Sequence, residues 1–444
     1  MRVTCLPTPT RDPSPQGGGA QTQRRGVCPG LSAPLPTGDG LLVRMRPLDA
    51  MPIAAFSRLC ALAAEHGNGI VEITARGSIQ VRGLSAASAP RFAADVAALG
   101  IAAQDGVPIL TNPLAGLAPD DIIDAVAFAA ELRRALARQS FAAKLSPKIS
   151  VAIDGGGAFT LDAVAADIRL RAAQRHAEQI FQISVGGDAA SAAPLGWVAV
   201  GDGTEAATRL LDELAKRGRN ARAREIVRNE GIAPFHAAVA DLLRGEATPS
   251  VTQPPSEVIG THRLRDGSYA CGVALPFGHA DASLLQRLIQ SAEQAAASGV
   301  IAAPGRTLIA VGLAPAKVSD FTIQAEQLGF IARAGDPRRC VIACAGAPFC
   351  TSGQIATRAI APRIAETAAR LDAGFVTIHL SGCAKGCAHP KKAELTIVGS
   401  PQGCALVADG STQDAPFAVV AMDELAAAVA HYGRAPNKCE ARDG

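Results

Sequence analysis

The order of apolar and polar residues predicts strands and helices along most of the chain. In some stretches apolar residues recur every three or four positions, as on one face of a helix, and in others they alternate with polar residues, as in a strand. The predicted strands span residues 41–47, 70–80 and 148–154, and the predicted helices span 53–66, a stretch that opens at Pro119, and 204–217. This mixture predicts a fold that contains both sheets and helices.

An internal repeat divides the chain into two similar parts. The clearest linker lies within residues 246–258, where Pro254 and Pro255 prevent regular structure. When the part after the linker is shifted by 229 residues onto the part before it, Ser78 falls on Thr307 and Gly83 falls on Gly312. Matches at glycines and strand positions in the same order favour a duplication over chance similarity. A duplicated chain can fold around a pseudo-two-fold axis with a ligand cleft between its halves.

Composition narrows the class of protein. Apolar residues make up 48% of the 444 residues and charged residues 19%, which excludes a mainly disordered chain. The net charge of +3 gives no general attraction to nucleic acid or membrane, and 4% aromatic residues supply few platforms for base stacking. Residues 1–24 lack the apolar core of a secretory signal and are expected to form a flexible tail. We therefore expect a cytoplasmic protein without nucleic-acid or membrane partners.

Four of the 11 cysteines form two short pairs. Five residues separate Cys344 from Cys350, and three residues separate Cys383 from Cys387. Four thiolates in such pairs can surround one compact metal centre, and a 4Fe–4S cluster takes four cysteines. A structural zinc site is the main alternative, although its pairs are usually two to four residues apart, and buried unliganded cysteines are the other. The spacing favours a cluster.

These cysteine pairs resemble those of the sulfite and nitrite reductase superfamily. In that superfamily the cysteines hold a 4Fe–4S cluster, and the last one also bridges to the iron of sirohaem. The T-x-R-x-x-x-Q motif of the superfamily is matched by Thr74, Arg76 and Gln80. Its Asn-rich loop resembles the segment around Asn112, and its basic strand after a proline resembles the segment at Lys148.

Longer segments resemble one branch of the superfamily, the precorrin-3B synthases of aerobic cobalamin synthesis. They are RRGVCPGLSAPLPTGDGLLVRMRP (24–47), LSPKISVAIDGGG (145–157), ALPFG (274–278) and SGCAKGCAHPKKAEL (381–395). The resemblance implies a duplicated α+β fold of the sulfite reductase type around a pseudo-two-fold axis. The implied parts are the tail 1–24, a ferredoxin-like half-domain 25–104, a tetrapyrrole-binding α/β domain 105–245, the linker 246–258, a second ferredoxin-like half-domain 259–332 and a 4Fe–4S-binding α/β domain 333–444.

The resemblance also implies the reaction: precorrin-3A, O2 and two reducing equivalents give precorrin-3B and water, with hydroxylation of the macrocycle and closure of a lactone. A precorrin carries acetate and propionate groups, and the planar guanidinium of Arg binds a carboxylate through two hydrogen bonds. Alternate residues of a strand face the same side, so Arg44 would point with Arg46, and Arg76 with Gln80 and Arg82. A solvated sheet face is the competing interpretation. With the resemblance, the candidate substrate-binding residues are Arg44, Arg46, Arg76, Gln80, Arg82, Asn112 and Lys148.

One departure from the reductases bears on the cofactor. Sulfite reductases place a second Lys two residues after the first on the basic strand, and here that position is Ser150. This difference fits a site in which the substrate takes the place of sirohaem, so sirohaem is not expected. The resemblance implies a non-haem iron with unassigned ligands and an external electron donor, a reductase or a ferredoxin. The alternatives are a sirohaem-dependent sulfite or nitrite reductase and an iron–sulfur electron carrier.

Overall fold

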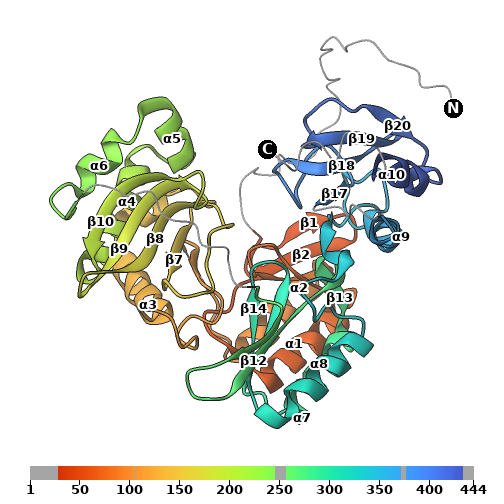
Figure 1. The fold of residues 1–444 in the computed structure, drawn as a ribbon, viewed down its shortest axis with the longest axis horizontal. Helices are drawn as coiled ribbons and strands as arrows, with labels where there is room; N and C mark the ends of the chain where they lie inside the picture. Colours follow the sequence, from red (N-terminus) through yellow and green to blue (C-terminus); the bar gives the residue numbers. More distant parts are fainter. Residues whose placement is uncertain (1–28, 105, 246–256, 372–376, 434–444) are drawn as a thin grey trace. The chain divides into compact units, whose positions relative to one another are not determined.

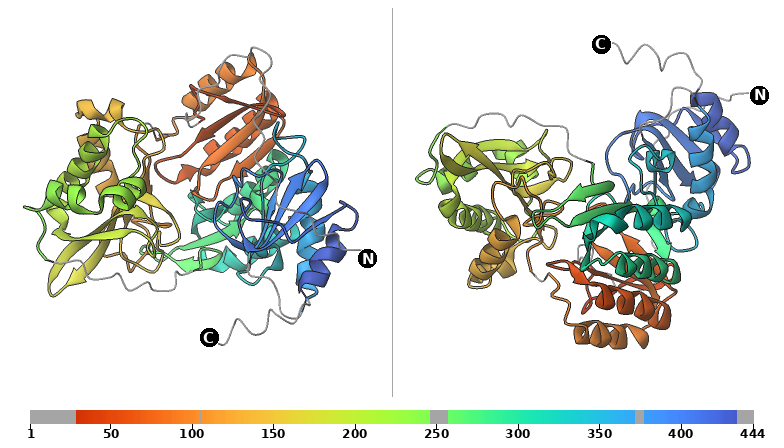
Figure 2. Two further views of the ribbon diagram at one scale, coloured as in Figure 1. Left: turned by 90° about the horizontal axis from the view of Figure 1, so that it is seen from above. Right: turned by 60° about the horizontal axis from the view of Figure 1, so that its bottom comes forward.

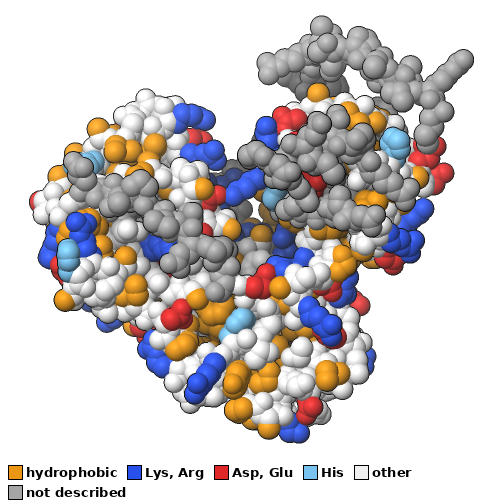
Figure 3. All heavy atoms as spheres, in the orientation of Figure 1, with side chains coloured by type: hydrophobic (Ala, Val, Ile, Leu, Met, Phe, Trp, Pro, Cys, Tyr) orange, Lys and Arg blue, Asp and Glu red, His pale blue; other side chains and the backbone are white. Residues whose placement is uncertain are grey.

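The computed structural model describes residues 29–104, 106–245, 257–371 and 377–433. They fall into two compact units, a larger one within Cys28–Arg339 and a smaller one within Cys340–Gly444. The predicted tail and most of the predicted linker lie outside the described residues. Among the described helices, none has the length and apolar character needed to cross a membrane. Basic and acidic side chains are interspersed over the face drawn in Figure 3, as the near balance of charge predicts.

Two five-stranded sheets of the same design form the centre of the larger unit. Their strands are β1 (Leu35–Thr37), β2 (Gly40–Met45), β3 (Met51–Pro52), β4 (Ile70–Ile73), β5 (Ile79–Leu84), β11 (Gly260–Arg263), β12 (Tyr269–Ala274), β13 (His279–Asp281), β14 (Gly299–Ala303) and β15 (Thr307–Leu313). The strand orders are β1-β2-β5-β4-β13 and β11-β12-β15-β14-β3. Each sheet therefore takes its last strand from the other repeat, because β13 pairs with β4 and β3 pairs with β14.

Four helices pack against these sheets, α1 (Ile53–His66), α2 (Ser88–Ala98), α7 (Ala282–Gln294) and α8 (Val318–Gln327). Figures 1 and 2 show α1 and α7 side by side, and the two helices are in contact. Phe56 and Leu59 of α1 belong to the same buried core as Leu285 and Leu288 of α7. The two repeats therefore share one hydrophobic core in addition to exchanging strands.

Equivalent glycines support the predicted duplication. Gly83 is the second-last residue of β5 with a φ of 72°, and Gly312 lies at the same place in β15 with a φ of 81°. A Cβ would lie 2.5 Å from the Cβ of Asn68 at the first position and 2.3 Å from the Oγ of Ser298 at the second. Both the backbone conformation and the lack of space require glycine at these two positions.

Two further five-stranded sheets share a second topology. One lies in the larger unit and contains β6 (Ile109–Thr111), β7 (Val151–Asp154), β8 (Ala166–Arg175), β9 (Glu178–Gly187) and β10 (Ala193–Ala199). The other lies in the smaller unit and contains β16 (Val341–Ala343), β17 (Ile378–Ser381), β18 (Ala393–Ser400), β19 (Gly403–Gly410) and β20 (Ala418–Val420). In each sheet the first three strands are parallel and the last three are antiparallel.

The helices of these sheets complete the fold (Figure 1). They are α3 (Ala125–Leu136), α4 (Gly203–Lys216), α5 (Ala223–Glu230) and α6 (Ala233–Val239) in the larger unit, and α9 (Thr357–Ala369) and α10 (Leu425–Gly433) in the smaller one. Because the carboxyl ends of adjacent parallel strands meet at one edge of a sheet, the loops after β6 and β7 are neighbours, and so are the loops after β16 and β17. One of these edges carries Asn112, and the other carries the four paired cysteines.

Three predicted elements differ from the structure, and the first is the strand predicted over residues 148–154, which begins only at Val151. The strand predicted over residues 70–80 is a hairpin, because the backbone turns at Gly77, which has a φ of 74°, and the Thr74 hydroxyl accepts a hydrogen bond from the N–H of Ser78 at 2.9 Å. The helix predicted to open at Pro119 begins later, at Ala125, because the Asp124 side chain caps it by accepting the N–H of Val126 at 2.9 Å.

Candidate functional site

A cavity of about 400 Å³ lies in the larger unit, a size within the range of small-molecule sites. Its walls come from segments far apart in the sequence: residues 46–50 after β2, residues 109–117 at and after β6, and residues 301–304 at the end of β14. Two further segments complete the lining: the turn that carries Arg76, and one side of α3. Three predicted site residues, Arg46, Arg76 and Asn112, therefore line a single cavity.

The charges around this cavity are mostly positive. Three arginines, Arg46, Arg76 and Arg133, line it together with two carboxylates, Asp49 and Asp124. The pKa of Arg46 is lowered to about 10, first by burial and then by the positive charges of Arg76, Arg44 and Arg133. Such repulsion between guanidinium groups would be relieved by a bound anion, so the cavity is suited to a ligand that carries carboxylates.

Arg76 lies at the tip of the hairpin between β4 and β5, against the second repeat. Its backbone forms an isolated bridge with Pro304, and its Nη2 donates to the carbonyl of Ala165 at 3.1 Å. A Cβ on the next residue, Gly77, would lie 2.7 Å from the carbonyl carbon of Ala303. The side chain of Arg76 is exposed, and its position on a turn means that the predicted strand parity with Gln80 was wrong.

Asn112 is buried directly after β6 and holds two loops together. Its Oδ1 accepts the N–H of Gly155, which follows β7, at 2.9 Å, and its Nδ2 donates to Asp121 at 3.1 Å. Asp121 also accepts the N–H of Gly116 at 3.3 Å. Burial raises the pKa of Asp121 to about 6, although the hydrogen bonds from Gly116 and Asn112 favour its charged form. Asn112 therefore positions one wall of the cavity.

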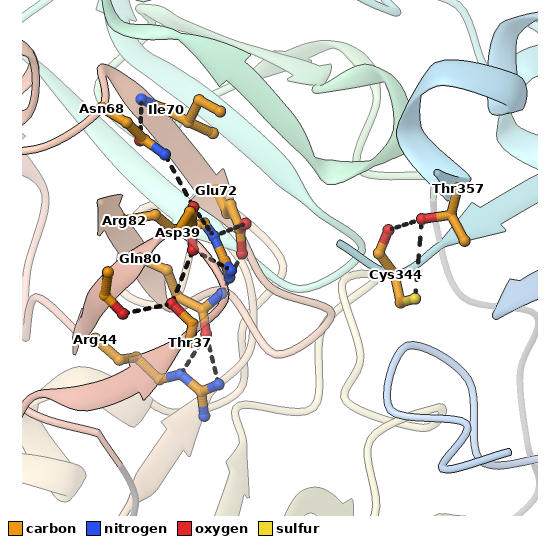
Figure 4. Close-up of polar contacts among 11 residues, drawn as sticks. Thr37, Asp39, Arg44, Asn68, Ile70, Glu72, Gln80, Arg82, Cys344 and Thr357 are labelled. Atoms are coloured by element: carbon orange, nitrogen blue, oxygen red, sulfur yellow. Dashed lines mark hydrogen bonds and ion pairs between the residues drawn. The ribbon is translucent and has the colours of Figure 1, made fainter. Parts of the chain in front are cut away.

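Arg44 and Gln80 lie opposite each other on the paired strands β2 and β5, outside the cavity lining (Figure 4). The Nε of Arg44 donates to the Oε1 of Gln80 at 2.8 Å. The amide of Gln80 in turn donates to Glu72, its cross-strand partner on β4. This face of the sheet thus satisfies its polar groups across three strands, and a contact of Arg44 or Gln80 with substrate stays a prediction.

Arg82 is 4% exposed and pairs with a carboxylate of the same sheet. Its Nε and Nη2 donate to the two oxygens of Asp39 at 3.0 and 2.8 Å, and Glu72 lies 3.5 Å away. Figure 4 shows Asn68 and Thr37 converging on Asp39, each through a hydrogen bond. Burial alone would raise the pKa of Asp39, but the hydrogen bonds from Arg82 and Thr37 and the charge of Arg82 bring it below its usual value.

Lys148 lies in the loop before β7 and is not among the residues that line the cavity. It is exposed, and its backbone N–H donates to the hydroxyl of Ser146 at 3.4 Å. Ser150, two residues later, is 1% exposed, and its N–H donates to Asp167, which is paired with Arg222 at 2.9 Å. The role of Lys148 in substrate binding stays a prediction.

The four paired cysteines lie in two loops at one edge of the sheet in the smaller unit. Cys344 follows β16, and Cys383 comes two residues after β17. The N–H of Gly382 donates to the Sγ of Cys344 at 3.1 Å. A Cβ on Gly382 would lie 3.0 Å from the Cα of Gly346 and 3.4 Å from the Cα of Gly353, so the two loops pass each other at backbone distance.

The thiol of Cys387 is affected electrostatically by the other three. Burial raises the pKa of Cys387, and the thiols of Cys383, Cys344 and Cys350 raise it further, whereas Lys385 lowers it. Within the described residues, no three His, Cys, Asp or Glu side chains gather closely enough to hold a single metal ion. A 4Fe–4S cluster places its four thiolates on four different irons and so spreads them further apart. The donor set and the shared neighbourhood fit such a cluster, whose assignment stays a prediction.

The loops of the two sheets correspond to each other in detail. Asn112 is the first residue after β6, and Cys344 is the first residue after β16. Gly155 and Gly382 are the first residues after the neighbouring parallel strands, and each donates its N–H to the side chain of the corresponding Asn or Cys. The same hydrogen bond therefore holds the edge of the cavity in one repeat and the cysteine loops in the other.

Sequence reasoning missed three charged residues of the cavity, Arg133, Asp49 and Asp124. The spacing of Val126 and Arg133, seven residues apart and hence on one face of α3, is the signal that could have pointed to Arg133, because both line the cavity. Nothing in the sequence marks the loop residue Asp49 as a neighbour of α3.

Comparisons with known proteins agree with this architecture. A family model described as the nitrite/sulfite reductase ferredoxin-like half domain matches residues 33–99. A precorrin-3B synthase from Sinorhizobium sp is 39% identical over 420 residues, which cover 94% of this chain and 90% of the relative. A sulfite reductase [ferredoxin] from Mycolicibacterium paratuberculosis is 26% identical over 79% of this chain and 68% of its own length.

Among solved structures, that of the Mycobacterium tuberculosis NirA protein superposes with a TM-score of 0.70 at 21% identity. The superposed region covers 87% of this chain and 79% of the NirA chain. The likeness confirms the predicted α+β fold of the sulfite reductase type.

Proposed function

The chain belongs to the precorrin-3B synthase family, and on this premise we propose the reaction that it catalyses. It converts precorrin-3A, O2, two electrons and two protons to precorrin-3B and water. One oxygen atom enters the macrocycle, which is hydroxylated, and an acetate side chain closes a lactone. The second oxygen atom leaves as water, which accounts for both reducing equivalents.

The observation that carries this proposal is the cavity lined by Arg46 and Arg76. Burial, and then the charges of neighbouring arginines, lower the pKa of Arg46, and a precorrin supplies the carboxylates that would neutralise these cations. We therefore place an edge of the tetrapyrrole, with its acidic side chains, against these two residues.

Other residues of the lining would orient the macrocycle and exclude water. Leu114 is buried beside the cavity, and the apolar segment 301–304 of the second repeat forms another wall. Asn112 fixes the loop that carries Leu114 through its hydrogen bonds to Gly155 and Asp121. Water exclusion strengthens each contact between a guanidinium and a carboxylate.

We further propose that a 4Fe–4S cluster is held by Cys344, Cys350, Cys383 and Cys387. When bound, such a cluster supplies the transfer of single electrons from an external donor. The chain's own residues prepare the loops for it: the N–H of Gly382 donates to Cys344, and the charge of Lys385 favours the thiolate of Cys387. The name of one relative contains ferredoxin, and we propose a ferredoxin or a reductase as the donor for this chain.

The proposal includes a non-haem iron, for which we assign no ligands, and excludes a resident sirohaem, because the substrate would occupy its place. Two assays on purified protein test the cofactors. Acid–acetone extraction should release no sirohaem, and metal analysis should find cluster iron and sulfide that are lost in Cys383→Ser and kept in Cys60→Ser, whose thiol is buried in the core of the larger unit. Stoichiometric sirohaem together with sulfite or nitrite reduction would favour a reductase instead.

A further inference from the structure

We propose that Arg133 is an anion-binding residue of the cavity and that it takes a carboxylate of the ligand. It lies in none of the motifs shared with the reductases, and it was not among the residues predicted from the sequence. The proposal rests on the proposed function only for the identity of the ligand as a tetrapyrrole polycarboxylate.

The position of Arg133 on α3 directs it to the cavity. Val126 and Arg133 are two helical turns apart on one face, and both line the cavity, whereas Ala129 and Leu132 are buried in the adjoining core. The neighbouring Arg134 is exposed, and its Nε donates back to the carbonyl of Ala130 at 3.4 Å. Two adjacent arginines of one helix therefore have different surroundings.

The hydrogen bonding of Arg133 supports the proposal. Its Nε is buried and has no hydrogen-bond partner among the described residues. Burial lowers the pKa of Arg133, and the negative charge of Asp49 acts in the opposite direction. A buried donor without an acceptor is unfavourable, and a shift of the Arg133 side chain toward an anion in the cavity would relieve that state.

Two other arginines of the larger unit, the buried Arg82 and the half-buried Arg222, are satisfied by carboxylates. Arg82 donates to Asp39, and Arg222 donates to Asp167, in each case through two hydrogen bonds. Arg133 instead faces Arg46, whose pKa it helps to lower. The cavity thus combines a cation that lacks a protein acceptor with a second cation that repels it, which is the arrangement expected of an anion-binding site.

The test compares Arg133→Ala with the matched control Arg134→Ala in the purified holoenzyme. The probes are uroporphyrin III, a stable tetrapyrrole with eight carboxylates, followed by fluorescence titration, and precorrin-3A, followed by KM. Arg133→Ala should weaken both by roughly 10- to 100-fold, the range expected for one charge-assisted hydrogen bond, and Arg134→Ala should change neither by more than about twofold. The melting temperature of Arg133→Ala should equal or exceed that of the parent, because no protein hydrogen bond of Nε is lost.

Two further variants separate an anion site from a structural role. Asp49→Asn should tighten binding of uroporphyrin III, since it removes a negative charge that competes for Arg133, and Arg133→Lys should restore part of the affinity lost in Arg133→Ala. Equal affinities of Arg133→Ala and Arg134→Ala would overturn the inference, as would a loss of affinity accompanied by a lower melting temperature and unaffected by Asp49→Asn. A parent enzyme that leaves precorrin-3A unbound and unconverted would overturn the proposed function instead.

Discussion

Arg82 lies on β5 and Arg46 directly follows the neighbouring strand β2, yet the two guanidinium groups have opposite surroundings. Arg82 is neutralised by Asp39 and is nearly inaccessible, so it holds the sheet together. Arg46 donates to the Ser78 hydroxyl at 3.0 Å but has other arginines as its charged neighbours. The sequence predicts that both arginines lie on one polar face. It could not show that, within the described residues, Arg82 is paired with a carboxylate and Arg46 is not, because the partner of Arg82, Asp39, comes from the turn before β2.

Because Arg82 is paired with a buried carboxylate, we expect its truncation to destabilise the folded state. Arg82→Ala leaves Asp39 and Glu72 with buried negative charge and should lower the free energy of unfolding by about 3–5 kcal/mol. Chemical denaturation of the parent and the variant measures this loss, and adding Asp39→Asn should recover part of it. A loss below about 1 kcal/mol would show that the pair is not structural.

Arg76 should behave as a binding residue, because its side chain is exposed at a turn. Arg76→Ala should weaken binding of precorrin-3A by roughly 10- to 150-fold, the range for a hydrogen bond of about 1.5–3 kcal/mol, and should leave the cluster intact. Arg91→Ala, an exposed arginine of α2, is the matched control. If the two variants bound precorrin-3A with equal affinity, Arg76 would not be a binding residue.

The raised pKa of Asp121 makes the folded state less stable as the pH rises from about 4 to about 6. Its pKa rises from 3.8 to about 6 on folding, so the folded state binds the extra proton between these values. Stability therefore falls as pH rises through this window, and the unfavourable contribution is complete above it. Asp121→Asn cannot ionise, so its melting temperature relative to the parent should increase from pH 4.5 to pH 7.5. A constant difference across this range would mean that Asp121 titrates normally.

The carboxyl ends of the parallel strands position the loops of both candidate sites. The loops after β16 and β17 meet because Gly346, Gly353 and Gly382 leave no side chains between them. Gly382→Ala would place a Cβ 3.0 Å from a backbone atom of Gly346. We expect this variant to lose iron and sulfide on purification, while Gly335→Ala, at a glycine with open space around it, should keep them. A full complement of both in Gly382→Ala would contradict this account of the loops.

Elements were predictable where one periodicity dominates. The helix predicted over residues 53–66 has those bounds in the structure, since its apolar positions meet a core. The hairpin within residues 70–80 was missed because its apolar residues continue strand-like spacing on both sides of the turn, and only Gly77 and the Thr74 hydroxyl mark the reversal. That error placed Arg76 on a strand.

For the whole molecule, the internal duplication and the resemblance of the cysteine pairs and other motifs to the sulfite and nitrite reductase superfamily predicted the fold. They could not predict the cavity, because its walls come from residues 46–50, 109–117 and 301–304, which meet only after the repeats exchange β3 and β13. Arg133 illustrates the limit: in the sequence it is one of two consecutive arginines on a helix, and its surroundings depend on these distant segments.

We propose that this chain inserts one oxygen atom from O2 into precorrin-3A. The most direct test is a single measurement: turnover of precorrin-3A by the purified, reduced enzyme under ¹⁸O2, with mass spectrometry of the product. We expect precorrin-3B with one ¹⁸O atom per molecule. Product that carries its new oxygen from water, or precorrin-3A left unchanged by enzyme with a full and reduced cluster, would contradict it.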